Sequence, residues 1–191
     1  MLPIADLDIE ETEGLENAFM TKNDTEAILA LLHQVKPRTM VEFGVNYGFT
    51  ARELLKRVPS IESYIGIDVD SPDYVPPFLP SQRVEIPEEP GREAKSDPRF
   101  RLIVRPRGAY DLHCRDIGPV DAALIDGDHS RQGVENDTGL ALSCVRPGGV
   151  IMWHDYSQYS TVDVPQVLHE LWEKGHPLFW ARGASLAFQR T

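Results

Sequence analysis

The chain has 191 residues, of which 41% are hydrophobic and 26% are charged, and this predicts one domain (residues 1–191) with an ordinary apolar core. Its net charge of −11 disfavours nucleic acid as a partner, because a surface that neutralises phosphates needs clustered lysine and arginine. No apolar run reaches membrane-spanning length and the N-terminus is acidic, so we expect a cytoplasmic protein without a membrane segment. Its two cysteines lack metal-ligand spacing and fit a reducing compartment.

The first part of the chain is strongly acidic and lacks a sustained hydrophobic period. We expect residues 1–22 to form a loosely packed N-terminal arm. Asn23 and Glu26 then have the spacing of a helix capping box, and apolar residues follow at helical intervals. A helix is therefore predicted from Asn23 to the residues before Pro37, which cannot continue it.

An apolar run over residues 39–43 ends in an acid and passes through two glycines into a helix-like segment over 51–58. This pattern predicts a strand, a tight loop and a helix. The glycines let a ligand approach the backbone, and the helix N-terminus offers unpaired N–H groups. The spacing Glu-x-Gly-x-x-x-Gly lacks the glycines that bind pyrophosphate in nicotinamide dehydrogenases. An acid at the strand end instead favours a ligand with a cationic group.

Glu42, Gly44 and Gly48 of this loop resemble motif I of class I methyltransferases, which use S-adenosylmethionine. This cofactor carries an ammonium group and a sulfonium group. The resemblance implies that S-adenosylmethionine is the cofactor here, and that these three residues and Asn46 bind it.

A second apolar run over residues 63–70 ends in acids, as expected of a strand that is buried on both faces. In nucleotide sites an acid at such a position accepts hydrogen bonds from both ribose hydroxyls. The resemblance implies this role for Asp68, because in the family the acid directly follows the apolar residues. Two alternatives stay open: Asp68 only caps the next turn, or Asp70 takes its place.

Residues 70–98 form an acidic insertion that holds seven of the chain's fifteen prolines, so most of it cannot be a regular helix. We expect a lid or a dimer arm, with a solvated acidic loop as the alternative, and a homo-oligomer stays open. A third strand is predicted over 99–108, where Pro106 and the flanking arginines suit a sheet edge. The resemblance implies that Gly108 and its two neighbours lie beside the adenine of the cofactor.

The most specific stretch is Asp126-Gly127-Asp128-His129-Ser130, which follows a buried strand starting at Val120. It brings two carboxylates and an imidazole together within four residues, and Ser130 can cap the helix that follows. After that helix, a further strand ends in His154-Asp155. The carboxyl ends of parallel strands face one crevice, so four acids are expected to converge there: Glu42, Asp68, Asp126 and Asp155.

This stretch resembles the small-molecule O-methyltransferases that act on macrolide sugars and, more distantly, the catechol-type enzymes. The resemblance implies a Mg²⁺ or other divalent cation held by Asp126 and Asp155, with His154 as the third ligand. His129 is then the general base, and Asp126 takes part in catalysis and borders the cofactor. The family often has an acid or an amide at the position of His154. Plainer interpretations stay open for two residues: Asp128 only braces the loop or pairs with an arginine, and His154 is a core histidine with a satisfied N–H.

A helix that begins after Asp163 and a hairpin around Arg182 and Gly183 end the chain. Together the elements predict a doubly wound, Rossmann-like α/β fold: a seven-stranded, mostly parallel sheet with a C-terminal antiparallel hairpin. The resemblance covers residues 23–191 apart from 70–98. It implies an S-adenosylmethionine-dependent O-methyltransferase with a small hydroxylated acceptor. Two alternatives stay open: a metal-dependent hydroxylase of the same fold, and a non-catalytic partner protein that binds S-adenosylmethionine.

Overall fold

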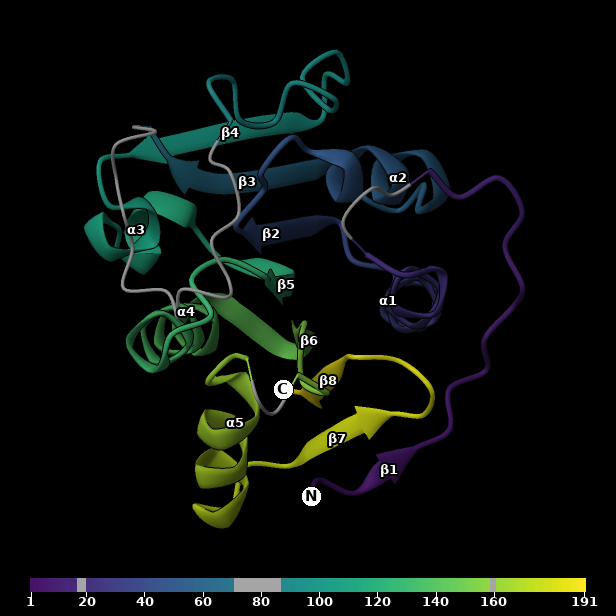
Figure 1. Cartoon of the computed structure of the whole chain (residues 1–191). Coiled ribbons are helices and arrows are strands. Elements are labelled where there is room, and N and C mark those ends of the chain that lie inside the picture. Colours follow the sequence, from purple (N-terminus) through teal and green to yellow (C-terminus); the bar gives the residue numbers. More distant parts are fainter. Residues whose placement is uncertain (17–19, 71–86, 159–160) are drawn as a thin grey trace.

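The structure is a computed structural model of the chain that describes residues 1–16, 20–70, 87–158 and 161–191. Most of the predicted proline-rich insertion, residues 71–86, lies outside the described residues. In the described part, eight strands form one sheet in the order β1-β7-β8-β6-β5-β2-β3-β4 (Figure 1). The strands are β1 (Ile4–Ala5), β2 (Thr39–Phe43), β3 (Ser63–Val69), β4 (Phe100–Arg105), β5 (Val120–Ile125), β6 (Val145–Trp153), β7 (Leu178–Ala181) and β8 (Ala187–Arg190).

The centre of the sheet is parallel. Strands β6, β5, β2, β3 and β4 each run parallel to the next, whereas β8 lies antiparallel between β6 and β7. The predicted fold class, a mostly parallel sheet with a C-terminal antiparallel hairpin, is confirmed, and β4 lies at the sheet edge as expected. This order places the carboxyl ends of β6, β5, β2 and β3 next to one another.

The predicted number of seven strands is wrong, because the N-terminal arm adds an eighth. β1 pairs in parallel with β7, and the N–H of Trp180 donates to the carbonyl of Pro3 at 2.8 Å. The side chain of Leu2 is buried, and its N–H donates to the hydroxyl of Tyr156 at 2.9 Å. A strand of two residues has no period that a sequence pattern could reveal. The start of the arm is therefore packed against the sheet and not loose.

Helices cover both faces of the sheet (Figure 1). On one face, Leu31 of α1 and Leu54 of α2 share an apolar cluster with Met40 of β2. On the opposite face, Val134 of α4 shares a second cluster with Val41 of β2. Met40 and Val41 reach opposite faces because side chains alternate along a strand. The helices are α1 (Lys22–Val35), α2 (Phe49–Arg57), α3 (Cys114–Ile117), α4 (Arg131–Cys144), α5 (Val164–Glu173) and the 3₁₀ helix η2 (Gly108–Asp111).

The helix starts include one wrong prediction and one confirmed prediction. The hydroxyl of Thr21 accepts the N–H of Asp24 at 3.2 Å, and the carboxylate of Asp24 accepts the N–H of Thr21 at 3.3 Å. The capping box of α1 therefore consists of Thr21 and Asp24 and not of Asn23 and Glu26, because the same spacing occurs two residues earlier. Ser130 caps α4 as predicted, and its hydroxyl accepts an N–H of the first turn at 3.3 Å.

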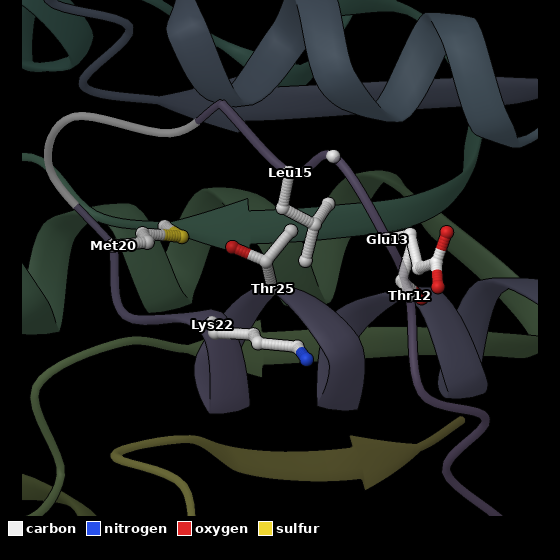
Figure 2. A pocket seen from close by; sticks show the side chains of 7 residues that line it. Thr12, Glu13, Leu15, Met20, Lys22 and Thr25 are labelled. Carbon is white, nitrogen blue, oxygen red and sulfur yellow. The ribbon is translucent and has the colours of Figure 1, made fainter.

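A cavity of about 320 Å³ lies between the N-terminal arm and α1, and Figure 2 shows the side chains around it. It shares no residue with the acids at the strand ends. Its lining residues are Thr12, Glu13, Gly14, Leu15, Met20, Lys22 and Thr25.

Two further features bear on the sequence predictions. Among the described residues, none of the helices has the length and apolar character needed to cross a membrane. Cys114 and Cys144 are free thiols, and Cys144 is buried.

Candidate functional site

The predicted acids lie at neighbouring strand ends. Glu42 and Asp68 are the second-to-last residues of β2 and β3, and Asp126 directly follows β5. Backbone pairing continues past the strands, because the N–H of Asp126 donates to the carbonyl of Phe43 at 2.9 Å. Burial raises the pKa of Glu42 well above its usual range, and the nearby charges of Asp126 and Asp68 raise it further. The structure therefore brings these three carboxylates close enough to interact.

Glu42 is enclosed by protein on the side facing β3. Its side chain is 1% exposed, and the hydroxyl of Tyr64 donates to its Oε2 atom at 2.9 Å. Burial, together with the neighbouring Glu42 carboxyl, also raises the pKa of the Tyr64 hydroxyl well above its usual value. A cation near Glu42 would offset the cost of ionising this carboxyl, because an opposite charge favours the charged form.

The two glycines of the loop are needed for contacts within the protein. Gly44 has φ +83°, and a Cβ there would lie 2.4 Å from the carbonyl oxygen of Asp126. Gly48 has φ +89°, and its Cβ would lie 3.0 Å from the Cα of Gly91. From the sequence pattern, both glycines were expected to let a ligand approach the backbone. In the structure, Gly44 lets the loops after β2 and β5 touch, and Gly48 lets the segment around Gly91 pack on the loop.

Asp68 connects β3 to the glycine loop. Its Oδ2 atom accepts the N–H of Asn46 at 2.6 Å, and its Oδ1 atom accepts the N–H of Val69 at 2.7 Å. Burial raises the pKa of Asp68, while these backbone hydrogen bonds oppose the rise. Val45 supplies a third backbone hydrogen bond to this carboxylate. A carboxylate has about four lone-pair positions, so Asp68 keeps room for a further hydrogen bond from a ligand. The alternative residue Asp70 is exposed.

The residues after β4 and β5 support the rim of the site. Gly108 is buried at the start of η2, where a Cβ would lie 3.2 Å from the side chain of Val69. The hydroxyl of Tyr110 donates to Asp128 at 2.9 Å, and the other oxygen of Asp128 accepts the N–H of Ser130 at 2.9 Å. Asp128 thus braces the loop, which is one of the plainer interpretations of this residue.

Asp126, His154 and Asp155 form a group that could hold a metal ion. Each offers one ligand atom, and these atoms lie within 4.8 Å of one another. The Nδ1 atom of His154 lies 3.0 Å from Oδ1 of Asp126 and 3.3 Å from Oδ1 of Asp155. Asp155 has φ +60°, a left-handed conformation that Asp adopts more readily than most residues. Two carboxylates and one imidazole nitrogen are a donor set that fits a divalent cation.

The electrostatics of this group reflect its opposite charges. Burial raises the pKa of Asp126, but the neighbouring His154 and His129 outweigh burial and hold that pKa below its usual range. Burial raises the pKa of Asp155, and here the two imidazoles offset it only in part. For His154, burial lowers the pKa, but Asp126, Asp24 and Asp155 hold it well above its usual value. Without a cation, protons on His154 and Asp155 are therefore favoured, and they offset the negative charge of the group.

His129, the predicted general base, lies beside the same carboxylates. Its Nε2 atom is 3.4 Å from Oδ1 of Asp126 and 3.6 Å from Oδ2 of Asp155. Burial lowers the pKa of His129, but these two carboxylates raise it above its usual value. A cation on the carboxylates would oppose that effect and favour the neutral imidazole that a general base needs.

Asp24 is a member of this network that the sequence analysis missed. It is 2% exposed, and its Oδ2 atom lies 3.3 Å from the Nε2 atom of His154. In the sequence it stands inside a predicted helix start, 130 positions before His154. No motif spacing connects residues so far apart, so only the packing of α1 beside β6 reveals the contact.

Comparison with protein families matches residues 41–156 to a family described as a methyltransferase domain. The match covers more than half of the chain and runs from β2 to just beyond β6. It includes the glycine loop and all of the strand-end acids. None of the curated proteins matches the chain.

Solved structures share this fold at low sequence identity. A methyltransferase of Podospora anserina, PaMTH1, bound to SAH, is 14% identical with a TM-score of 0.64, covering 87% of this chain and 76% of that one. The O-methyltransferase TomG of Streptomyces achromogenes, in complex with SAM, is 14% identical with a TM-score of 0.63, covering 97% and 92%. The MycE methyltransferase of the mycinamycin biosynthetic pathway, in complex with Mg and SAH, is 18% identical with a TM-score of 0.52, covering 80% and 44%.

Proposed function

The chain belongs to the methyltransferase domain family and has the class I methyltransferase fold, and we propose that it transfers the methyl group of S-adenosylmethionine to a hydroxyl oxygen of a small acceptor. The observation that carries this proposal is the position of the Asp126, His154 and Asp155 group next to the buried carboxyl of Glu42. One part of the site is suited to a cationic cofactor, and the adjoining part is suited to a divalent cation.

The cofactor would lie over the glycine loop. Glu42 would face its positive charge, because this buried carboxyl has no basic partner among the described residues and gains most from a cationic ligand. Asp68 would face the ribose hydroxyls with the acceptor capacity that Asn46, Val69 and Val45 leave free. Gly44, Gly48, Gly108 and Asp126 would complete the walls. The solved structures of PaMTH1 with SAH and of TomG with SAM support this assignment through their shared fold.

Asp126, His154 and Asp155 would hold the divalent cation, with Mg²⁺ as the ion that the MycE complex contains. Such a cation, when bound, lowers the pKa of an acceptor hydroxyl. His129 would take the hydroxyl proton at its Nε2 atom, which faces the two carboxylates. The acceptor oxygen then forms a bond to the methyl carbon as the sulfur–carbon bond breaks, which yields a methyl ether and S-adenosylhomocysteine. The sulfonium is already activated, so the protein contributes mainly in-line positioning.

Two alternatives have weaker support. A hydroxylase of the same fold would add an oxygen atom to its substrate, and a non-catalytic partner protein would bind S-adenosylmethionine without turnover. Product mass separates all three functions, because only methyl transfer adds one methyl group per acceptor. The predicted cytoplasmic location and a homo-oligomer stay predictions of the sequence.

Calorimetry with S-adenosylhomocysteine on the wild type, Asp68→Ala and Asp70→Ala tests the cofactor site. Loss of a hydrogen-bonded carboxylate corresponds to roughly 10- to 100-fold weaker binding, and we expect this for Asp68→Ala. Asp70→Ala is the matched control, because Asp70 is exposed at the end of the same strand and should leave the affinity unchanged. Equal affinity in all three proteins would refute the cofactor assignment.

The metal is tested separately by turnover on a panel of hydroxylated acceptors, with mass detection of the methylated product. We expect a chelator to abolish turnover and added Mg²⁺ or Mn²⁺ to restore it. Turnover that persists at full rate in the chelator would refute the catalytic role of the cation.

A further inference from the structure

We propose that Asp24 positions His154 as a nitrogen ligand of the divalent cation, by accepting the proton on Nε2 so that the lone pair of Nδ1 faces Asp126 and Asp155. The inference rests on the proposed function, because it needs a cation at this pair of carboxylates. Asp24 would not touch the cation or the substrate, so it is a positioning residue.

The contacts of His154 place one carboxylate on one side of the ring and two on the other. Nε2 lies 3.3 Å from Oδ2 of Asp24, while Nδ1 lies 3.0 Å from Asp126 and 3.3 Å from Asp155. His154 is 6% exposed and Asp24 is 2% exposed. The ring is therefore held between carboxylates in a buried environment, where an unpaired polar atom is costly.

His154 must give up one ring proton before it can bind a metal, and the nitrogen that keeps the other proton decides whether the ring can bind at this site. With the proton on Nε2, the ring donates to Asp24, and the lone pair of Nδ1 points at the two carboxylates. Lone pair and carboxylates repel each other unless a positive charge stands between them. With the proton on Nδ1, the ring donates toward Asp126, and no lone pair is left on that side. Asp24 favours the first tautomer, which is the one that ligates.

Asp24 is fixed before any cation binds. Its Oδ1 atom accepts the N–H of Ser185 at 2.6 Å, and its Oδ2 atom accepts the hydroxyl of Thr21 at 2.6 Å. These partners lie in the turn before β8 and at the start of α1. The N–H of Thr21 also donates to Oδ2, at 3.3 Å. The carboxylate therefore cannot turn away from His154 without breaking these hydrogen bonds, and the histidine is oriented in advance.

This arrangement has a consequence for the choice of metal. Mg²⁺ prefers oxygen ligands, whereas Co²⁺ and similar transition ions accept imidazole readily. With His154 oriented by Asp24, the site should bind Co²⁺ more tightly than Mg²⁺. Co²⁺ binds an oriented imidazole nitrogen more favourably than Mg²⁺ does, so loss of Asp24 should weaken Co²⁺ binding more than Mg²⁺ binding.

The test is a Co²⁺ titration of chelator-treated full-length protein, without cofactor or acceptor, followed by calorimetry and by visible absorption. Asp24→Asn keeps the shape of the side chain but replaces one carboxylate oxygen with an NH₂ group and removes the negative charge that faces Nε2 of His154. We expect about 10- to 100-fold weaker Co²⁺ binding, the range seen when outer partners of metal ligands are lost. The comparison variant Thr21→Ala removes only the hydroxyl donor to the same carboxylate oxygen and leaves the N–H donors of Thr21 and Ser185 in place, so it should weaken Co²⁺ binding much less than Asp24→Asn does.

A double-variant comparison separates positioning from general destabilisation. If Asp24 acts through His154, then Asp24→Asn should have no further effect on Co²⁺ binding in a His154→Gln background. Unchanged affinity in Asp24→Asn alone, or an equal loss in the His154→Gln background, would overturn the proposal.

The position of the remaining ring proton of His154 can also be measured on the wild type, so this test does not depend on the folding of a variant. In the Zn²⁺-loaded protein, ¹⁵N NMR of His154 should show a protonated Nε2 and a metal-bound Nδ1, and a protonated Nδ1 would overturn the proposal.

The outcomes also separate this inference from the proposed function. If methyl transfer needs the metal but Asp24→Asn binds Co²⁺ normally, only the inference fails. If Asp24→Asn weakens Co²⁺ binding but no acceptor is methylated, only the proposed function fails.

Discussion

Replacing Gly44 with alanine should disrupt the site in addition to straining the backbone, because the added methyl group meets the backbone of Asp126. Gly44 has φ +83°, and a left-handed conformation costs a residue other than glycine roughly 1–2 kcal/mol. The new Cβ would also lie 2.4 Å from the carbonyl oxygen of Asp126, whereas ordinary contact begins at 3.4 Å. The Asp126 peptide must therefore move by about 1 Å, and overpacking of this kind costs roughly a further 1–3 kcal/mol.

Gly118 supplies a matched control for this experiment. It also has φ +83°, but a Cβ there would meet nothing within 4 Å. Gly118 has ψ 173°, a region that glycine occupies almost alone, so Gly118→Ala should lose only backbone strain of roughly 1–3 kcal/mol. Because Gly118→Ala adds strain without a new contact, the difference in metal affinity and activity between the two variants reports on the contact between the loops after β2 and β5.

The assays are denaturant unfolding, metal titration and methyl transfer on both variants. Gly44→Ala should lose roughly 2–5 kcal/mol of stability in total, as the sum of the two costs. A shift of about 1 Å in a reacting group can cost about 100-fold in rate, so methyl transfer should fall by that order. Gly118→Ala should keep both metal affinity and activity. If Gly44→Ala matches Gly118→Ala in stability and retains wild-type metal affinity, the contact with Asp126 does not position the site.

Two further predictions concern buried carboxyl groups. Tyr64→Phe removes the hydroxyl that donates to Glu42 at 2.9 Å, so we expect a loss of about 1–3 kcal/mol in unfolding free energy and weaker binding of S-adenosylhomocysteine by calorimetry. Unchanged affinity would count against Glu42 as a cofactor residue. For Asp137, burial and the nearby Asp128 raise the pKa to about 7 from an ordinary value of 3.8. Between these pH values the unfolded chain loses this proton and the folded chain keeps it, so stability falls as pH rises and levels off above pH 7. Asp137→Asn should remove this fall and stabilise the protein by up to roughly 4 kcal/mol at pH 8, but not at pH 4. Denaturant unfolding of both proteins from pH 4 to pH 8 checks this, and parallel stability curves of wild type and variant would contradict the assignment.

Much of the central fold followed from local patterns. The run before Gly44 predicted strand, loop and helix, and the run that ends at Asp68 predicted a strand buried on both faces. The elements β2, α2 and β3 have these positions in the structure. Such predictions succeed because apolar period and glycine placement act over a few neighbouring residues. The two-residue strand β1 was missed for the same reason, since it is too short to show a period.

By itself, the sequence determined that acids stand at strand ends and that a histidine follows each of two such strands, because both facts depend only on residue order. Tertiary structure alone decided which groups share a hydrogen bond: Asp24 with His154, and Tyr64 with Glu42. It also decided that Gly44 makes room for a neighbouring backbone. These contacts join residues that are far apart in the chain, and they depend on how helices and strands pack, which no local spacing encodes.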